Sequence, residues 1–229
     1  QRGTPIAVKM LLEALSARGD EIDALVFTGG EPVEIARTRF FHVPALSSMP
    51  PGFSVKKILA DMLMVPMTGW RMLRGRYDLV IAVEESAYIA MVLGVLFRIP
   101  YLCDVDSSIP EQINDKFSPP HWLQRFLVSS ERLSLRRSSG AMTCCRALED
   151  LVRHHAPDLP VQTLEDVPML EPDTGGPVPE DCRFDVPVMM YVGNLESYQG
   201  IDLLLDGFAR VDPVATPAQL VIIGGTRVH

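Results

Sequence analysis

The sequence is poor in the residues that build metal sites and disulfide frameworks. It has only four cysteines among 229 residues, and none of them shows the spacing of a zinc-binding pair. Cys144 and Cys145 are adjacent, which disfavours a disulfide between them, and the five histidines show no ligand spacing. We therefore expect no metal site, and we expect reduced, mostly buried cysteines of the kind found in cytoplasmic proteins.

Positive charge is also in short supply. The formal net charge is −8, which argues against a general nucleic-acid binder because phosphate affinity depends on clustered Lys and Arg. The total hides two basic stretches, residues 52–76 and 116–137, each with five basic side chains and one acidic one. The acidic residues gather later, from Glu149 to Asp185. We expect no nucleic-acid partner.

Long hydrophobic runs are absent as well. No uninterrupted apolar run reaches the roughly 20 residues that span a bilayer, and no signal-peptide pattern opens the chain. We expect a cytoplasmic protein that could work at the inner face of the membrane. Residues 54–76 combine Lys and Arg with Met, Leu and Trp70, which is compatible with peripheral contact with an anionic membrane. The alternative is that Met62, Val65 and their apolar neighbours pack on a sheet while the basic side chains stay solvated.

What the sequence does contain is a regular alternation of extended and helical patterns. Helices are expected at residues 6–15, 55–73 with a bend at Pro66, 87–97, 123–137, 147–155 and 201–211, and strands at 21–27, 39–46, 77–83, 100–105, 140–145, 188–193 and 218–225. Strands that alternate with helices predict an α/β fold, a Rossmann-like parallel sheet with helices on both faces.

The alternation is interrupted once. Residues 171–187 are rich in Pro, Gly and acidic side chains and have no periodicity, which predicts a linker. We expect one domain at residues 1–170 and the beginning of a second, incomplete one at 188–229. The first helix has no strand before it, so the first domain is expected to lack its first strand, and the chain is interpreted as a fragment.

In open parallel α/β sheets, ligands bind beyond the carboxyl ends of the strands. Glu84 and Glu85 follow the strand expected at 77–83, and Asp106 and Ser107 follow the strand at 100–105, with Glu111 close behind. Asp106 and Glu111 are the catalytic candidates, and Glu84, Glu85 and Ser107 are the acceptor-side candidates. The alternative interpretation is that they are helix caps or first-turn acids.

Glycines at helix entries form a second group of candidates. Gly193 and Asn194 follow the strand at 188–193, and Gln199 and Gly200 precede the next helix. Gly3, followed by Thr4, takes the equivalent place before the first helix. A close-approach glycine at a helix N-terminus favours phosphate, although such glycines are more often plain turn residues.

Four stretches together carry a family resemblance. They read "RGTPIAVKMLLEALSARGDEIDALVF", "YDLVIAVEESAYIAMVLGVLFRIPYLCDVDSSIPEQI", "LRRSSGAMTCCRALEDLV" and "YVGNLESYQGIDLLLDGF". The chain resembles the retaining glycosyltransferases of family 4 through nearly its whole length, and the last stretch is the most specific. The resemblance implies a GT-B fold, in which the N-terminal Rossmann-like domain mostly receives the acceptor and the C-terminal one the nucleotide-sugar donor.

Roles follow from the resemblance position by position. Gly3 matches the glycine-rich loop that approaches the donor phosphate, although Thr4 stands where a second glycine is common. Gly193 and Gly200 match the glycines of the donor-domain turn. Residue 106 matches the place after a strand where a histidine near the reacting sugar is frequent, so the aspartate there is a departure from the pattern.

The donor turn departs from the family in charge. Many members place Arg after the first glycine and Lys before the second, whereas this chain has Asn194 and Gln199, which donate hydrogen bonds but carry no charge.

The resemblance implies a retaining glycosyltransferase that uses a nucleotide-sugar as substrate and a sugar or lipid-linked acceptor, with no cofactor. The fragment alone is expected to be inactive. The alternative is a non-catalytic Rossmann-like binding or interaction module, which the neutral donor turn would suit. The sequence leaves open which sugar, nucleotide and acceptor are used.

Overall fold

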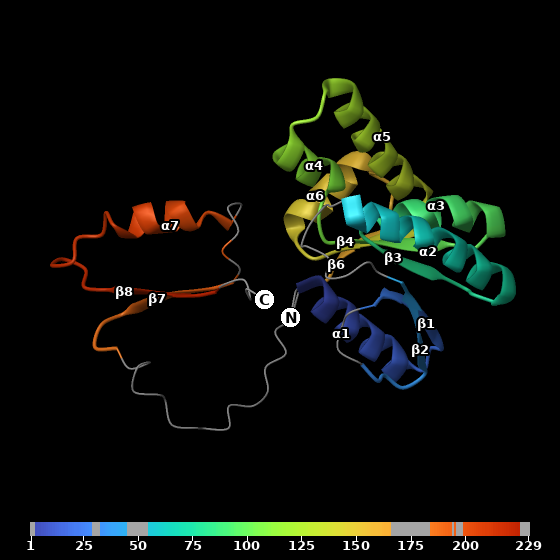
Figure 1. Ribbon diagram of the computed structural model, residues 1–229, viewed down its shortest axis with the longest axis horizontal. Coiled ribbons are helices and arrows are strands. Elements are labelled where there is room, and N and C mark those ends of the chain that lie inside the picture. Colours follow the sequence, from blue (N-terminus) through green and yellow to red (C-terminus); the bar gives the residue numbers. More distant parts are fainter. Residues whose placement is uncertain are drawn as a thin grey trace. The chain divides into compact units, whose positions relative to one another are not determined.

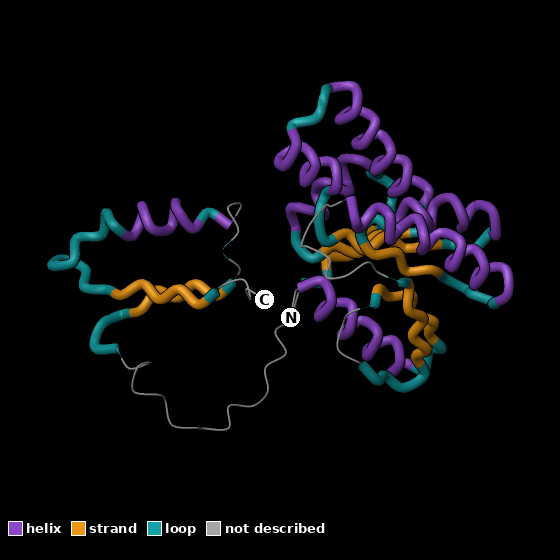
Figure 2. Tube along the Cα trace, in the orientation of Figure 1, coloured by secondary structure: helices purple, strands orange, loops and turns teal. Residues whose placement is uncertain are grey.

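The structure is a computed structural model of the chain, and it describes residues 3–28, 33–44, 55–165, 184–193, 195 and 199–224. The chain divides into two compact units, Gln1–Pro168 and Met169–His229. Figure 1 shows the helices and strands of each unit, and Figure 2 colours them by type. The predicted linker at 171–187 lies largely outside the described residues, so it stays a prediction.

Helices and strands alternate through the first unit. Its elements are α1 (Gly3–Arg18), β1 (Ile22–Phe27), β2 (Thr38–Val43), α2 (Val55–Arg74), β3 (Val80–Val83), α3 (Ser86–Phe97), β4 (Tyr101–Val105), α4 (Ile109–Phe117), α5 (His121–Arg137), β5 (Gly140–Thr143), α6 (Arg146–His155) and β6 (Val161–Thr163). The expected α/β class with parallel strands is confirmed.

The strands of the first unit form two parallel sheets. One has the order β3-β4-β5-β6, and the other pairs β1 with β2. Within the described residues no strand pairs with the second edge of β1 or with the outer edge of β3. The single sheet that the alternation suggests is therefore divided in two at this place.

The core lies on one face of the four-stranded sheet. Tyr101 and Cys103 of β4 and Ala141 of β5 are buried there against side chains from α3, α5 and α6, among them Leu135 and Val152. The buried Tyr101 hydroxyl donates a hydrogen bond to the carbonyl of Ser134 on α5. Figure 1 shows α3 and α5 on this side of the sheet and α1 on the other. The sheet thus separates a packed face from the face toward α1.

Two elements of the first unit differ from the sequence prediction. The helix α4 was not expected, because it is short and begins Ile-Pro after two serines, a composition typical of a loop. The strand β6 has only three residues, too few for a periodic pattern. In contrast, α2 continues through Pro66 over nearly the predicted range, and the expected bend at Pro66 stays a prediction.

The second unit contains β7 (Val188–Val192), α7 (Ile201–Phe208) and β8 (Gln219–Ile223), with β7 and β8 paired in parallel. This strand-helix-strand order agrees with the prediction. The helix ends at Phe208 and not at Val211, because the chain turns at Ala209 and Arg210, whose amides bond to the carbonyls of Leu205 and Gly207.

Gly94 tests the packing of α3 on the sheet. A Cβ at Gly94 would lie 2.9 Å from the Ile99 carbonyl oxygen and 3.3 Å from Cδ1 of Tyr101. We expect Gly94→Ala to lower the free energy of unfolding by about 1–3 kcal/mol, because the backbone must shift. Urea denaturation followed by tryptophan fluorescence measures this, since Trp70 and Trp122 both belong to the first unit.

The matched control is Gly69→Ala in α2. Its Cβ would meet only the Leu93 side chain, at 3.8 Å, which is an ordinary contact. We expect a gain of about 0.5–1 kcal/mol from helix propensity. A Gly94→Ala protein as stable as the parent would contradict the packing described here.

Candidate active site

A cavity of about 160 Å³ opens at the carboxyl ends of β4, β5 and β6. It lies between these strand ends and α1. Its lining residues are Ala7, Met10 and Leu11 of α1, Asp104 and Asp106 from the end of β4, Met142, Thr143 and Cys144 from the end of β5, and Leu164 and Glu165 after β6. The position is where ligands bind in open parallel sheets.

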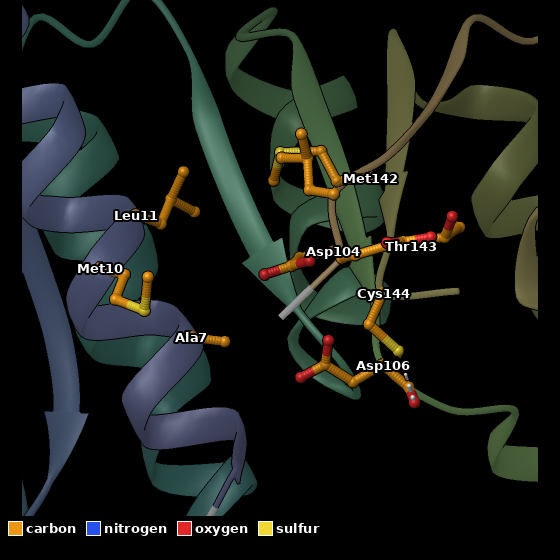
Figure 3. Close-up of a pocket in the computed structure, with 10 residues that line it drawn as sticks. Ala7, Met10, Leu11, Asp104, Asp106, Met142, Thr143 and Cys144 are labelled. Atoms are coloured by element: carbon orange, nitrogen blue, oxygen red, sulfur yellow. Dashed lines mark hydrogen bonds between the residues drawn. The ribbon is translucent and has the colours of Figure 1, made fainter. Parts of the chain in front are cut away.

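The acidic character of the cavity comes from the alternation of side chains along β4. Successive residues of a strand point to opposite faces, so Tyr101 and Cys103 enter the core while Asp104 and Asp106 belong to the other face. Figure 3 shows both carboxylates directed toward α1, from which Met10 and Leu11 approach. The cavity therefore presents carboxylates on one wall and apolar side chains on the opposite wall.

The β5 wall is anchored by hydroxyl groups. Thr143 is buried, with 1% exposure, and its hydroxyl lies 3.1 Å from the hydroxyl of Thr163 on β6. The Thr163 hydroxyl donates to the carboxylate of Glu149 on α6, which also accepts from Arg153. These two partners, Thr163 first, lower the pKa of Glu149. The chain of contacts ties β5, β6 and α6 together beside the cavity.

The β4 wall is linked to the β5 wall by a cysteine. The Cys144 thiol donates to the carbonyl of Asp106, with Sγ 3.8 Å from the oxygen (Figure 3). Cys103, in contrast, faces the core with 1% exposure, and burial raises the pKa of its thiol. Of these two cysteines, only Cys144 belongs to the cavity.

The three predicted acceptor-side residues, Glu84, Glu85 and Ser107, fall at the same edge of the sheet, but none of them lines the cavity. Of the two predicted catalytic residues, Asp106 lines it. The Glu84 amide donates to the carbonyl of Asp104, with Glu84 at φ 50°, so β3 ends directly beside this wall. The Ser107 hydroxyl accepts from the Gln112 side chain at 2.6 Å, which fixes it against α4.

Glu111, the second predicted catalytic residue, is not brought to the cavity. It lies exposed in the first turn of α4, while Ile113 on the same helix is buried. The helix was missing from the sequence interpretation, so the direction of this side chain could not be foreseen. Asp106 and Glu111 therefore do not form a pair that lines the cavity.

The predicted phosphate-binding residues are distributed over both units. Gly3 and Thr4 form the start of α1, whose later residues line the cavity. In the second unit the Gly193 amide donates to the carbonyl of Ile223, and Gly200 precedes α7 with a left-handed φ of 69°. Gln199 is exposed beside it, and Asn194 lies outside the described residues. Their role in binding a donor stays a prediction.

Asp104, Cys144, Met10 and Glu165 were not predicted as site residues. A signal for Asp104 was present, because Leu102, Asp104 and Asp106 alternate with the apolar Tyr101, Cys103 and Val105. Met10 and Glu165 reach the cavity only through the tertiary arrangement, which no local pattern indicates.

The described part of the chain contains no group of three or more His, Cys, Asp or Glu side chains that could hold a metal ion. None of the helices in that part is long and apolar enough to cross a membrane.

Comparison with solved structures finds the same fold. The chain is similar to sucrose-phosphate synthase from Thermosynechococcus elongatus, with a TM-score of 0.71 and 18% identity, over 99% of this chain and 58% of that one. It is also similar to LpCGTa in complex with UDP, with a TM-score of 0.53, 13% identity, 95% of this chain and 67% of that one.

A third similar structure is Anabaena HepE in complex with UDP, with a TM-score of 0.53 and 11% identity, over 99% of this chain and 68% of that one. The chain thus spans between about half and two thirds of the length of these neighbours. A search of curated protein sequences finds no match.

The sequence itself identifies the family. The family model described as "Glycosyl transferase 4-like domain" matches residues 2–163, which includes α1 and the ends of β4 and β5 that line the cavity. The match covers well over half of the chain and agrees with the GT-B type of fold. The chain therefore belongs to the glycosyl transferase 4-like family.

Proposed function

We propose that this chain is the acceptor-binding part, with the beginning of the donor-binding part, of a retaining glycosyltransferase. The enzyme would transfer a sugar from a nucleotide-sugar to a sugar or lipid-linked acceptor. The observation that carries the proposal is the cavity with Asp104 and Asp106 on its β4 wall, inside the unit that the family model matches.

The cavity suits a hydroxylated acceptor. Carboxylates accept hydrogen bonds from hydroxyl groups, and charge-assisted bonds of this kind are about twice as strong as neutral ones. The apolar wall of Met10 and Leu11 can pack against the carbon-bound hydrogens of a sugar ring. In this proposal Asp106 orients the acceptor hydroxyl, and Asp104 holds a neighbouring one.

The reaction is a substitution at the anomeric carbon. The acceptor oxygen forms a bond to that carbon, and the bond from the carbon to the nucleoside diphosphate breaks. The electron pair leaves with the diphosphate, which also takes up the proton of the acceptor hydroxyl. Retention means that the new bond forms on the same face of the sugar as the old one.

The leaving diphosphate would be stabilised by hydrogen bonds and not by a metal ion. In the proposal the backbone at Gly193 and Gly200 and the amides of Asn194 and Gln199 supply the donors. Two of the similar solved structures are complexes with UDP, which favours a UDP-sugar as the donor to test first. We expect transfer to persist in EDTA.

Substitution of the cavity carboxylates tests the acceptor role. In the natural polypeptide that contains this sequence, we expect Asp106→Asn to lower kcat/KM for the acceptor about 10²-fold, because a positioned carboxylate contributes about that much. Glu111→Gln is the matched control, since Glu111 is exposed outside the cavity, and its activity should equal the parent's. Release of UDP in the presence of acceptor is the measurement. Equal losses in both variants would contradict the assignment.

Titration calorimetry tests the donor role. We expect UDP-sugars or GDP-sugars to bind the natural polypeptide saturably, and we expect residues 1–229 alone to bind neither and to transfer no sugar. Sugar transfer by residues 1–229 would overturn the expectation of inactivity. If neither protein binds a nucleotide-sugar, the chain is instead a Rossmann-like binding module, as its uncharged Asn194 and Gln199 would allow.

We also propose peripheral membrane contact through residues 54–76. The apolar side chains of α2 are not all packed on the sheet: Met62 is 64% exposed and Trp70 is 53% exposed, although Met64 and Met72 are buried. The neighbouring helix α3, which contacts α2, exposes Val92, Val95 and Leu96. This observation favours the membrane over the alternative in which Met62 and Val65 pack inside.

Basic side chains accompany the exposed apolar ones. The Arg74 guanidinium lies 3.8 Å from the ring centroid of Trp70, and the exposed Arg76 follows. Basic residues near an anionic surface contribute about 1 kcal/mol each, and the apolar side chains insert at the headgroup level. We therefore expect α2 to bind an anionic lipid surface.

Vesicle sedimentation measures this contact. We expect binding to anionic vesicles and not to neutral ones, and we expect Arg74→Glu with Arg76→Glu to weaken it at least about tenfold. Arg125→Glu on α5, which also replaces a basic side chain by an acidic one but lies outside residues 54–76, is the control. The emission of Trp70, isolated by Trp122→Phe, should shift to the blue on binding. No sedimentation with anionic vesicles would rule the contact out.

A further inference from the structure

A buried carboxyl group on α5 stands behind the cavity and lines no part of it. The side chain of Glu131 is 12% exposed, and the Ser108 hydroxyl donates to both of its oxygens, at 3.1 and 3.3 Å. Glu131 therefore binds Ser108, the residue directly before α4, from a neighbouring helix.

Ser108 occupies the N-cap position of α4 but does not cap the helix itself. A serine there usually accepts a bond from an amide of the first turn, whereas this one makes no such bond and turns its hydroxyl to Glu131. This bond holds the carboxyl of Glu131 beside the N-terminus of α4. An ionised carboxylate suits that place, because the N-terminus of a helix is partially positive.

The segment that ends at Ser108 continues directly into the cavity wall. Asp106 lies two residues before Ser108, and its carbonyl accepts the bond from Cys144. The Asp106 backbone is thus held on one side by Cys144 and on the other by Ser108, which binds Glu131. A change at Glu131 reaches the cavity through a segment of three residues.

The groups that face Glu131 come from three further helices. From α6, the His155 Nδ1 atom lies 3.6 Å from its Oε2. From α3 and α4, Tyr88 and Glu111 interact with it electrostatically. On α5 itself Arg132 follows Glu131, and its charge contributes, after burial, to the lowered pKa of His155. The His155 ring is therefore neutral at neutral pH and does not offset a charge on Glu131.

Burial raises the pKa of Glu131 to about 7, and the Ser108 hydroxyl and the nearby Ile109 backbone oppose the rise. Burial also raises the pKa of Tyr88 to about 12, with the charge of Glu131 as the next cause, so Tyr88 stays neutral. Across the neutral range, then, Glu131 is the facing group that changes charge.

We propose that Glu131 is a positioning residue, which holds the 106–108 segment at the cavity through the Ser108 hydroxyl, and that protonation of its carboxyl loosens this segment. The ionised form accepts the Ser108 bond with charge assistance. The protonated form loses that assistance and one acceptor position. Acceptor affinity should then fall as Glu131 is protonated, and this consequence rests on the proposed function. The movement of the segment does not rest on it.

The alkylation rate of Cys144 reports on the segment without any ligand. In a Cys145→Ser, Cys182→Ser background the remaining thiols are Cys144 and the buried Cys103. The rate is measured with iodoacetamide from about pH 5.5 to about pH 8.5, for the parent and for Glu131→Gln. The ratio of parent to variant cancels the titration of the thiol itself. Glutamine keeps the shape and an acceptor oxygen but cannot ionise.

We expect this ratio to be close to one at low pH and to fall about threefold or more as Glu131 ionises, because the ionised carboxylate tightens the segment. The midpoint should lie near pH 7. Ser108→Ala, which removes the donor, should give the same pH profile as Glu131→Gln. Glu111→Gln removes a nearby acid without touching Ser108. Its alkylation rate relative to Glu131→Gln should therefore fall with pH as the parent's does.

A ratio that stays constant over the whole pH range would overturn the proposal. A pH-dependent fall that persists in Ser108→Ala would also overturn it. The Ser108→Ala variant therefore provides the test if Glu131→Gln does not fold. Because no nucleotide or acceptor is present, failure of this experiment and failure of the proposed transferase activity are separate results.

Discussion

The opposite chemistry of the two faces of β4 is the constraint on which the rest of the first unit depends. Tyr101 and Cys103 must be buried, and they are, against α3, α5 and α6. Because a strand alternates with a period of two, the same packing places Asp104 and Asp106 on the other face. A shift of one residue would bury two carboxylates, at a cost far above what the core could offset. The burial of the core side chains and the position of the two carboxylates therefore require the same register of β4.

The sequence was sufficient for the elements with strong periodicity. The strands β3, β4, β5 and β7 and the helices α2, α3 and α6 lie within a few residues of their predicted bounds. The rule that ligands bind at the carboxyl ends of strands led to Asp106, and Asp106 does line the cavity. Long apolar patterns and strand ends are local properties, which explains why they could be read without the fold.

The remainder depends on tertiary contacts. The helix α4 has little apolar pattern of its own. Glu131 on α5 binds Ser108 at its start, and no spacing in the sequence links residues 108 and 131. Without α4, Glu111 was interpreted as a neighbour of Asp106, whereas the helix directs it to solvent. Met10 and Glu165 belong to the cavity because α1 and the end of β6 approach β4 in space.

The two walls of the cavity are held by carboxylates whose pKa values are shifted in opposite directions. Glu149 stands at the surface, where Thr163 and Arg153 lower its pKa, so its bonds weaken only as pH falls into the acid range. Glu131 lies in the interior, where burial raises its pKa to about 7, so its ionised form is lost as pH falls through neutrality. The β5 wall is thereby constant under conditions in which the β4 wall responds. The β5 wall therefore keeps the site assembled, while the position of Asp106 changes with the charge of Glu131.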